Sequence, residues 1–242
     1  MTDTATPLRR PMYAAGVATA AAALGLLAFA ADFVDGAGGR VLIALTSSGF
    51  AWGLAAILAG RSADTARLAA VGAAALLIGA TTLYYLLIAV VSRRWSGGYL
   101  QDGSSAGLSG LRSVAVMAAV WLAGSILGGP LLGLLGHAIR AASVRVAALA
   151  AGVGCGLLSA EGWYAATWTP PGSPLTFDVP SFSPFALGQN IQIVLPLAVL
   201  AWLTVVHRLG RAWPSLLGAT AVTAATGALL WHVLEVVELR LA

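Results

Sequence analysis

VRVAALAAGVGCGLLSAEGWYAA, residues 144–166, is an apolar run of the length that predicts a transmembrane helix. It carries a basic residue near its start, Arg145, and an acidic residue near its end, Glu161. A charged side chain at the centre of a membrane helix costs about 2.5–3.5 kcal/mol, so such residues usually face the interior of a bundle and mark function. We therefore expect Glu161 to mark a functional site. A hydrogen-bonded Glu161 that only joins two helices is the alternative.

The composition of the whole chain is that of a polytopic membrane protein. Of its 242 residues, 59% are hydrophobic and only 9% are charged, whereas soluble domains carry about 25% charged residues. All 13 basic residues are arginines at the ends of apolar runs, so the net charge of +4 does not indicate nucleic-acid binding. The single cysteine, Cys155, and three scattered histidines predict neither a disulfide nor a metal site.

Seven apolar segments predict an all-α bundle of seven transmembrane helices that forms a single domain over residues 1–242. Clusters of Gly, Pro, Ser and Arg separate the segments and favour helix ends. The expected helices cover residues 12–30, 41–59, 68–91, 111–139, 144–166, 187–206 and 214–237. The fourth should be broken or kinked at Gly128–Gly129–Pro130, because proline removes a backbone donor. The first also resembles a signal peptide, with Ala28–Phe29–Ala30 as an A-x-A cleavage pattern.

Arginines are distributed unevenly between the two sides of this expected bundle. The N-terminal tail and the short connections after the second, fourth and sixth segments carry eight of them, and the other side carries five. The positive-inside rule therefore predicts a multi-pass protein of the cell membrane with a cytoplasmic N-terminus.

Most polar and aromatic residues within the expected helices share one depth, in the outer third of the bundle. This level follows from counting about 1.5 Å per helical residue from the end of each helix. Its members are Ser47, Ser48, Trp52, Tyr84, Tyr85, Trp121, Glu161, Gln189, Asn190, Gln192, Trp231, His232 and Glu235. The shared depth predicts a cavity that touches Glu161 and at least two of five side chains of this layer, namely Trp52, Tyr84, Tyr85, Trp121 and His232.

An acid in an aromatic-lined, water-poor site suits two kinds of chemistry. Burial favours the protonated form of a carboxyl group, which can then donate a proton, and the faces of Trp and Tyr attract cations. Such a site could initiate a carbocation cyclisation, or it could serve amine binding or proton-coupled transport. The glycines of the fourth segment are expected at close contacts between helices; they are Gly128, Gly129, Gly133 and Gly136.

A set of dispersed positions resembles a family of small actinobacterial polytopic membrane proteins, mostly of unknown function. These positions lie within residues 45–165 and comprise Ser48, Trp52, Tyr84–Tyr85, Trp121, Gly129–Pro130, Gly133 and Glu161–Gly162. The size of the chain and its aromatic, acid-bearing helices also look like the bacterial membrane-bound terpene cyclases that act on farnesylated indoles. The aspartate-rich metal motifs of soluble prenyl-diphosphate enzymes are absent from the sequence, so this likeness implies chemistry without a metal ion or cofactor.

We therefore expect an integral-membrane cyclase that acts on a lipophilic prenylated small molecule within the lipid bilayer. The predicted catalytic residues are Glu161, as proton donor, with Tyr84 and Tyr85. The predicted substrate-binding residues are Trp52, Ser48, Trp121, Trp163, Asn190, His232 and Glu235. The alternatives are a transport or efflux component in which Glu161 is the coupling residue, and a non-catalytic membrane subunit.

Overall fold

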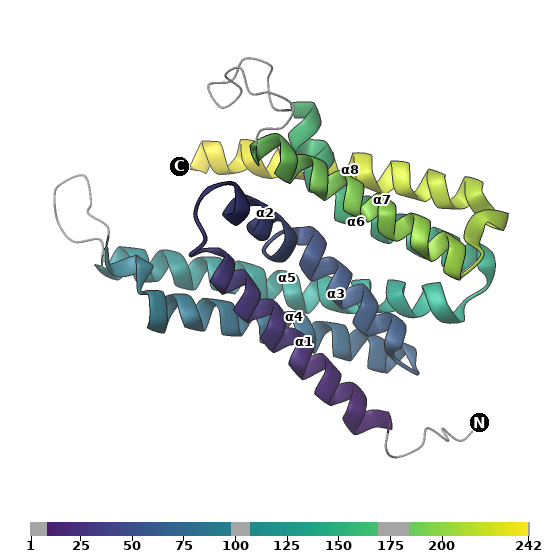
Figure 1. The fold of residues 1–242 in the computed structure, drawn as a ribbon, viewed down its shortest axis with the longest axis horizontal. Helices are drawn as coiled ribbons and strands as arrows, with labels where there is room; N and C mark the ends of the chain where they lie inside the picture. Colours follow the sequence, from purple (N-terminus) through teal and green to yellow (C-terminus); the bar gives the residue numbers. More distant parts are fainter. Residues whose placement is uncertain (1–8, 98–106, 169–183, 242) are drawn as a thin grey trace.

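The computed structural model describes residues 9–97, 107–168 and 184–241, which form helices joined by short connections (Figure 1). The long helices are α1 (Arg9–Ala31), α2 (Gly36–Thr46), α3 (Gly49–Ser62), α4 (Ala66–Leu87), α5 (Gly107–Ala141), α6 (Val144–Trp168), α7 (Pro184–Val206) and α8 (Trp213–Leu241). Short helical turns are η1 (Ile88–Ser92), η2 (Arg94–Ser96) and η4 (Leu209–Ala212). These ranges contain no β-strand, which confirms the predicted all-α class.

Five helical segments in the described part of the chain are long and apolar enough to cross a membrane. They are Arg10–Ala31, Ala66–Ser92, Gly107–Ala141, Val144–Trp168 and Leu209–Val233. Helix α7 adds a shorter apolar stretch, Ile191–Val206. The hydrocarbon core of a bilayer requires about 20 apolar residues per helix, so these lengths and compositions indicate a membrane protein.

The segment expected to form one helix over residues 41–59 is divided into α2 and α3, so that prediction is wrong. The backbone at Ser48 is extended, with φ −80° and ψ 157°. Ser and Thr side chains compete for backbone hydrogen bonds, and Thr46 Oγ1 donates to Leu42 O at 2.8 Å. The indole N–H of Trp52 donates to Thr46 O at 2.9 Å, which satisfies a carbonyl at the end of α2.

This division also affects the number of membrane spans. Helix α2 has 11 residues and α3 has 14, and each is shorter than the roughly 20 residues of a span. The predicted count of seven spanning helices is therefore not confirmed. Helix α5, in contrast, is one helix from Gly107 to Ala141 that contains Pro130, so of the expected break or kink at this proline the break does not occur.

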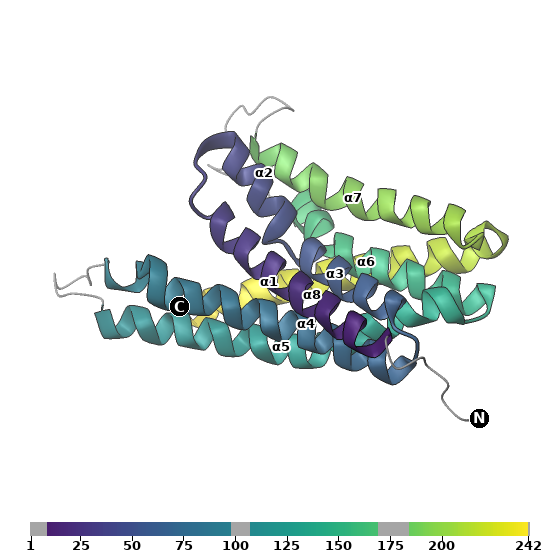
Figure 2. The same ribbon diagram turned by 60° about the horizontal axis from the view of Figure 1, so that its bottom comes forward.

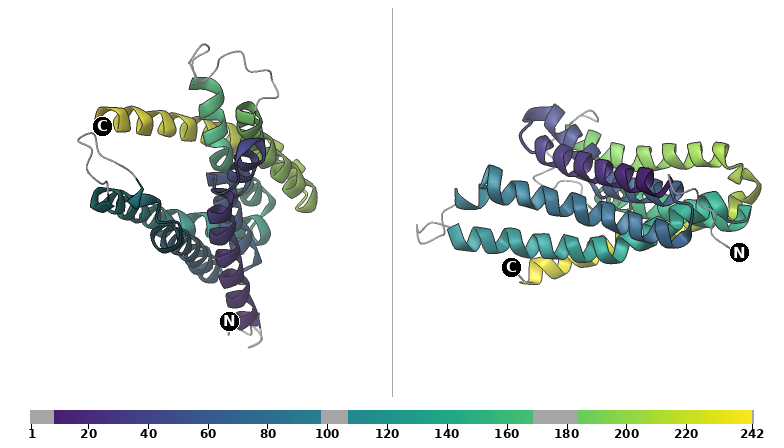
Figure 3. Two further views of the ribbon diagram at one scale, coloured as in Figure 1. Left: turned by 60° about the vertical axis from the view of Figure 1, so that its left-hand side comes forward. Right: turned by 90° about the horizontal axis from the view of Figure 1, so that it is seen from below.

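The helices pack as two groups, which α3 and a direct contact between α5 and α6 connect. Helix α4 lies alongside α5, while α6 lies alongside α8 and α7 (Figures 1 and 2). Helix α3 contacts α4, α5 and α6, and α1 crosses α4. Figure 3 shows the same groups from two further directions. Because α3 contacts both α4 and α5, its first residues, at the α2–α3 break, lie on the side of the first group.

Close packing of α5 depends on glycines that face its neighbours. The three glycines concerned are Gly129, Gly133 and Gly136. A β-carbon on any of them would collide with backbone atoms of α3 or α4, which confirms the close-packing role predicted for these three. Gly128 differs, because no atom lies within 4 Å of the position that its β-carbon would occupy.

Candidate functional site

A cavity of about 330 Å³ lies between α1, α3, α4 and α5, beside the α2–α3 break. Its polar and aromatic lining consists of Ser47, Ser48, Trp52, Thr81, Tyr84, Tyr85, Trp121 and Ser125. The rest of its wall is Ala, Gly and Leu, so none of the described residues that line it is charged. Small-molecule sites usually have volumes of about 300–1,000 Å³ and mostly apolar walls. The cavity therefore has the size and character of a site for a small lipophilic ligand.

Ser47 and Ser48 reach the cavity because α2 ends and α3 begins there. Ser48 is 6% exposed, and neither hydroxyl oxygen has a hydrogen-bond partner among the described residues. Ser48 precedes the first residue of α3, yet its side chain makes no capping hydrogen bond. An unsatisfied buried hydroxyl costs about 1–3 kcal/mol, so these two groups are available to bind a polar atom of a ligand.

The other two aliphatic hydroxyls of the cavity satisfy each other. Thr81 Oγ1 and Ser125 Oγ lie 3.1 Å apart, and Ser125 Oγ donates to Trp121 O at 2.8 Å. Because the only hydroxyl hydrogen of Ser125 is used in this way, Thr81 must donate to Ser125. The pair joins α4 to α5, so the buried hydroxyls without a partner among the described lining residues are those of Ser47 and Ser48 at the α2–α3 break.

Tyr84 is held at the cavity by an ionic network at the ends of α1 and α4. Its hydroxyl donates to Asp32 Oδ2 at 3.0 Å, and the same oxygen accepts a hydrogen bond from Arg94 Nη2 at 2.6 Å. The ring of Tyr84 packs edge to face against Tyr85, with the centroids 5.2 Å apart. The structure thus brings the two predicted tyrosines together, and it assigns the Tyr84 hydroxyl to a structural hydrogen bond.

Two tryptophans complete the aromatic part of the lining. Trp52 comes from α3, where its hydrogen bond to Thr46 O fixes the ring. Trp121 comes from α5, lines the cavity and is 48% exposed, so it borders an opening to the surface of the bundle. Both were predicted to bind substrate, and both lie in the same cavity as Ser48.

Glu161 is not among the residues that line this cavity, so the predicted cavity that contains it with these aromatic residues is wrong. Its Oε1 accepts a hydrogen bond from Gln192 Nε2 at 3.3 Å, which joins α6 to α7. Its Oε2 lies 3.6 Å from the position that a β-carbon on Gly49 would occupy. Gly49 is the first residue of α3, and the positive end of a helix dipole stabilises a carboxylate. Equal depth placed Glu161 with the aromatic residues, but depth does not specify which helices are neighbours.

His232 and Trp163, the other predicted site residues whose side chains the structure describes, do not line the cavity either. His232 stacks on Trp168, with the ring centroids 5.1 Å apart, and lies 6.3 Å from the Tyr164 ring. Trp163 is 39% exposed on the surface of α6. The side chains that lie outside the described part of the structure are those of Asn190 and Glu235. The predicted polar layer is thus divided between the cavity and the α6–α8 region.

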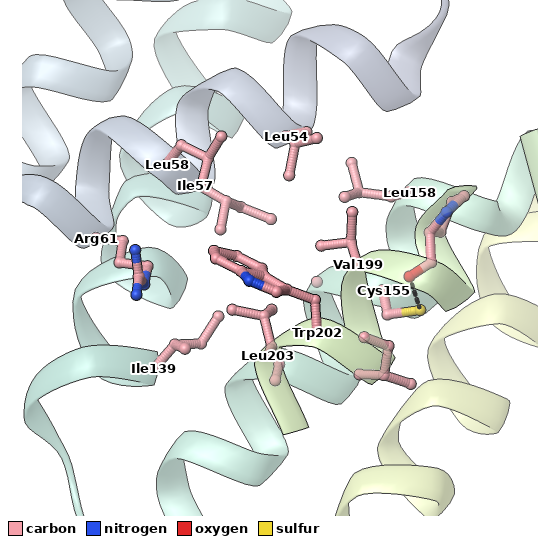
Figure 4. A pocket seen from close by; sticks show the side chains of 14 residues that line it. Leu54, Ile57, Leu58, Arg61, Ile139, Cys155, Leu158, Val199, Trp202 and Leu203 are labelled. Atoms are coloured by element: carbon pink, nitrogen blue, oxygen red, sulfur yellow. Dashed lines mark hydrogen bonds between the residues drawn. The ribbon is translucent and has the colours of Figure 1, made fainter. Parts of the chain in front are cut away.

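A second cavity, of about 10 Å³, lies between α3, α5, α6 and α7 (Figure 4). Its wall is mostly apolar, and in Figure 4 the Trp202 ring lies between Arg61 and Cys155. The Arg61 guanidinium lies over the Trp202 ring at 5.2 Å from its centroid, and Cys155 Sγ donates to Pro196 O at 3.3 Å. A space of this size holds about one water molecule, so it is a packing gap and not a site for an organic ligand.

Arg61 also makes a contact that predicts a pH dependence of folding. Its Nε donates to His207 Nε2 at 3.2 Å, which requires the neutral imidazole. Burial, together with the charge of Arg61, lowers the pKa of His207, which lies between two apolar spans. Below the ordinary histidine pKa of about 6.5, the unfolded chain therefore binds a proton that the folded chain does not, and stability falls.

We expect the melting temperature of the protein in detergent to decrease as the pH is lowered from 7 toward 5. In His207→Gln this decrease should be smaller, because glutamine can accept the hydrogen bond from Arg61 and has no titrating group in this range. Thermal unfolding of the two proteins across this pH interval measures the difference. An identical pH dependence in both would exclude His207 as the cause.

Comparisons of the chain with protein-family models, with curated proteins and with solved structures give no match. The resemblance to an actinobacterial family and to membrane-bound terpene cyclases therefore stays a prediction. In the described ranges, no group of three or more His, Cys, Asp or Glu side chains is placed to hold a metal ion. The function must be argued from the cavity itself.

Sequence reasoning missed four residues that shape the cavity. Asp32 and Arg94 lie in segments expected to be loops, and the sequence does not indicate that their partner is Tyr84 on another helix. The positions of Thr81 and Ser125 at the site could have been predicted from the sequence. Thr81 lies three residues before Tyr84, and Ser125 lies four residues after Trp121. Such spacings place two side chains on the same face of a helix.

Proposed function

We propose that this chain is an integral-membrane protein that binds a lipophilic small molecule in the cavity between α1, α3, α4 and α5. The observation that carries the proposal is the lining of that cavity: aromatic rings and an apolar wall, with a few hydroxyl groups and no charged side chain among the described lining residues. Sites for small molecules combine an apolar surface with a small number of polar groups that orient the ligand.

The proposed membrane orientation gives the ligand a route to this site. With the N-terminus in the cytoplasm, as the arginine distribution predicts, the cavity lies in the outer half of the bilayer. Trp121 lines the cavity and is also exposed at the surface of the bundle. A lipophilic ligand dissolved in the membrane would enter laterally, beside this residue.

Binding can be tested with the protein in lipid nanodiscs and a photoreactive analogue of farnesol as probe. Labelling should saturate with probe concentration and should be prevented by excess farnesol. Trp121→Ala should weaken competition by farnesol about tenfold, because a buried aromatic contact of about 1–2 kcal/mol is lost. Trp213→Ala is the matched control, since Trp213 is 60% exposed and does not line the cavity. If labelling instead rises linearly with probe concentration and excess farnesol does not reduce it, the probe only partitions into the bilayer and does not bind the cavity.

Proton-initiated cyclisation of a prenylated substrate is the second candidate function. It is favoured by the rings of Trp52, Tyr85 and Trp121 around one cavity, because aromatic faces stabilise cations. The reaction also needs an acid at the substrate. Glu161 Oε2 lies 3.6 Å from the position of a β-carbon on Gly49, and Gly49 lines the cavity. In this proposal a change of the Glu161 rotamer brings its carboxyl group to the cavity, where it protonates a double bond of the substrate. The resulting carboxylate takes a proton back when the final carbocation becomes an alkene.

Glu161→Gln distinguishes this second function from binding alone. The amide retains the size of the side chain and can still pair with Gln192, so farnesol binding should be unchanged. Turnover of a farnesylated indole, if the wild type shows it, should fall about 10²-fold or more when the general acid is removed. Full turnover in the Gln variant excludes Glu161 as the donor. Binding without turnover in the wild type favours a transport role in which Glu161 is the coupling residue.

A further inference from the structure

Among the described lining residues, the α2–α3 break supplies the cavity with its only buried hydroxyl groups that lack a hydrogen-bond partner. From this we infer, resting on the proposed function, that the ligand carries an uncharged hydrogen-bonding group, such as a hydroxyl or carbonyl, and that Ser47 and Ser48 bind it. The inference adds the chemical class of the polar end of the ligand to the binding site proposed above.

The position of the polar end follows from a comparison of the hydroxyl groups around the cavity. Thr81 and Ser125 are paired with each other, and the Tyr84 hydroxyl is bonded to Asp32. Ser47 Oγ and Ser48 Oγ are buried and have no partner among the described residues. Buried polar groups in native proteins are nearly always hydrogen-bonded. Both residues line the cavity, and a change of side-chain rotamer would turn each buried hydroxyl toward a polar atom of a ligand there.

The absence of charge on this polar end follows from the lining of the cavity. None of the described residues that line it is charged, so a ligand ammonium, carboxylate or phosphate would leave water without an opposite charge in contact, which is costly. A hydroxyl or carbonyl group avoids this penalty, and a seryl hydroxyl can donate a hydrogen bond to either of them.

The apolar part of the ligand would occupy the remainder of the cavity. That region is lined by the rings of Trp52, Tyr85 and Trp121 and by the leucines of α4 and α5. The ligand would therefore be amphipathic, with one short polar end at the α2–α3 break and an apolar body against α4 and α5.

Four probes with the same C15 chain and different ends test this assignment. They are farnesol, farnesoic acid, farnesylamine and the hydrocarbon farnesene, each used to compete with the photoreactive farnesol analogue in nanodiscs. Farnesol should compete about five- to tenfold better than farnesene, which is the gain expected of one or two hydrogen bonds. The acid and the amine should compete no better than farnesene. In the double variant Ser47→Ala/Ser48→Ala, farnesol should compete only as strongly as farnesene does. The competition by farnesene should be the same as in the wild type.

The outcomes separate this inference from the proposed function. If all four probes compete equally, or if the double variant binds farnesol as the wild type does, the assignment of the polar end is wrong but the cavity still binds lipophilic ligands. If the acid or the amine competes best, the site selects a charged group and the inference is overturned. If no probe competes, the proposed function fails and this inference fails with it.

Thermal unfolding of the ligand-free protein provides a second readout that does not depend on a probe. Ser48→Ala removes a buried hydroxyl that makes no capping bond, so the melting temperature should stay the same or rise. A lower melting temperature would show that Ser48 stabilises the fold, and it would contradict the assignment of its hydroxyl to a ligand.

Discussion

Replacing Gly133 with valine is expected to prevent the normal packing of α3, α4 and α5. A β-carbon at position 133 would collide with Ala69 O and lie 2.7 Å from Ala73 Cβ. Gly133 also faces Gly60 of α3, and the two helices are so close there that a β-carbon on Gly60 would collide with the backbone of Gly133. Overpacking typically costs about 1–3 kcal/mol and more when the backbone must move. We therefore expect a melting temperature at least roughly 10 °C lower, or no folded protein at all.

Gly218→Val is the matched control for this variant. Gly218 lies in α8, and no atom comes within 4 Å of the position of its β-carbon. Thermal unfolding in detergent should give a melting temperature close to that of the wild type for this control. If Gly133→Val were as stable as Gly218→Val, α5 would pack less closely against α3 and α4 than described. The walls of the cavity, which these helices form, would then also be less closely packed.

Replacing Gly128 with leucine is expected to block ligand binding and to leave the fold intact. Gly128 lines the cavity, and its β-carbon position has no neighbouring atom within 4 Å. The new side chain would occupy part of a space of about 330 Å³. Leucine also favours a helix over glycine by roughly 0.5–1 kcal/mol, so stability should not fall. Competition by farnesol in nanodiscs should weaken about tenfold or more, because ligand and side chain would overlap.

Gly218→Leu controls for the loss of a glycine and the gain of a large apolar side chain. It should bind farnesol as the wild type does, since Gly218 does not line the cavity. Normal binding by Gly128→Leu, in a protein with wild-type stability, would place the ligand elsewhere. Weak binding accompanied by a lower melting temperature would instead indicate a packing defect.

The lengths of the apolar runs allowed most of the helices to be predicted. The run expected over 144–166 is α6, Val144–Trp168, and that expected over 214–237 is α8, Trp213–Leu241. The interruption at Ser47–Ser48 was missed because apolar residues flank it on both sides, so the hydropathy pattern continues through it. The break depends on local hydrogen bonds of Thr46 and Trp52, which a hydropathy pattern does not contain.

The candidate site could be predicted only in part. Residue spacing predicted a common depth for these side chains, and Ser48, Trp52, Tyr84, Tyr85 and Trp121 do line one cavity. Spacing does not give the helix face or the neighbouring helix. For this reason Glu161 and His232, for which the same depth was predicted, were assigned to the same site although they contact Gln192 and Trp168.

The central claim is that a lipophilic small molecule binds in the cavity between α1, α3, α4 and α5, and mapping the position of a photochemical cross-link tests it most directly. The photoreactive farnesol analogue would be cross-linked in nanodiscs, and the modified residues identified by mass spectrometry of peptides. We expect farnesol-sensitive modification of residues around the cavity, such as Trp52, Tyr85 and Trp121. Modification confined to the open groove between α1 and α4, lined by residues such as Tyr13 and Val71, would contradict the claim.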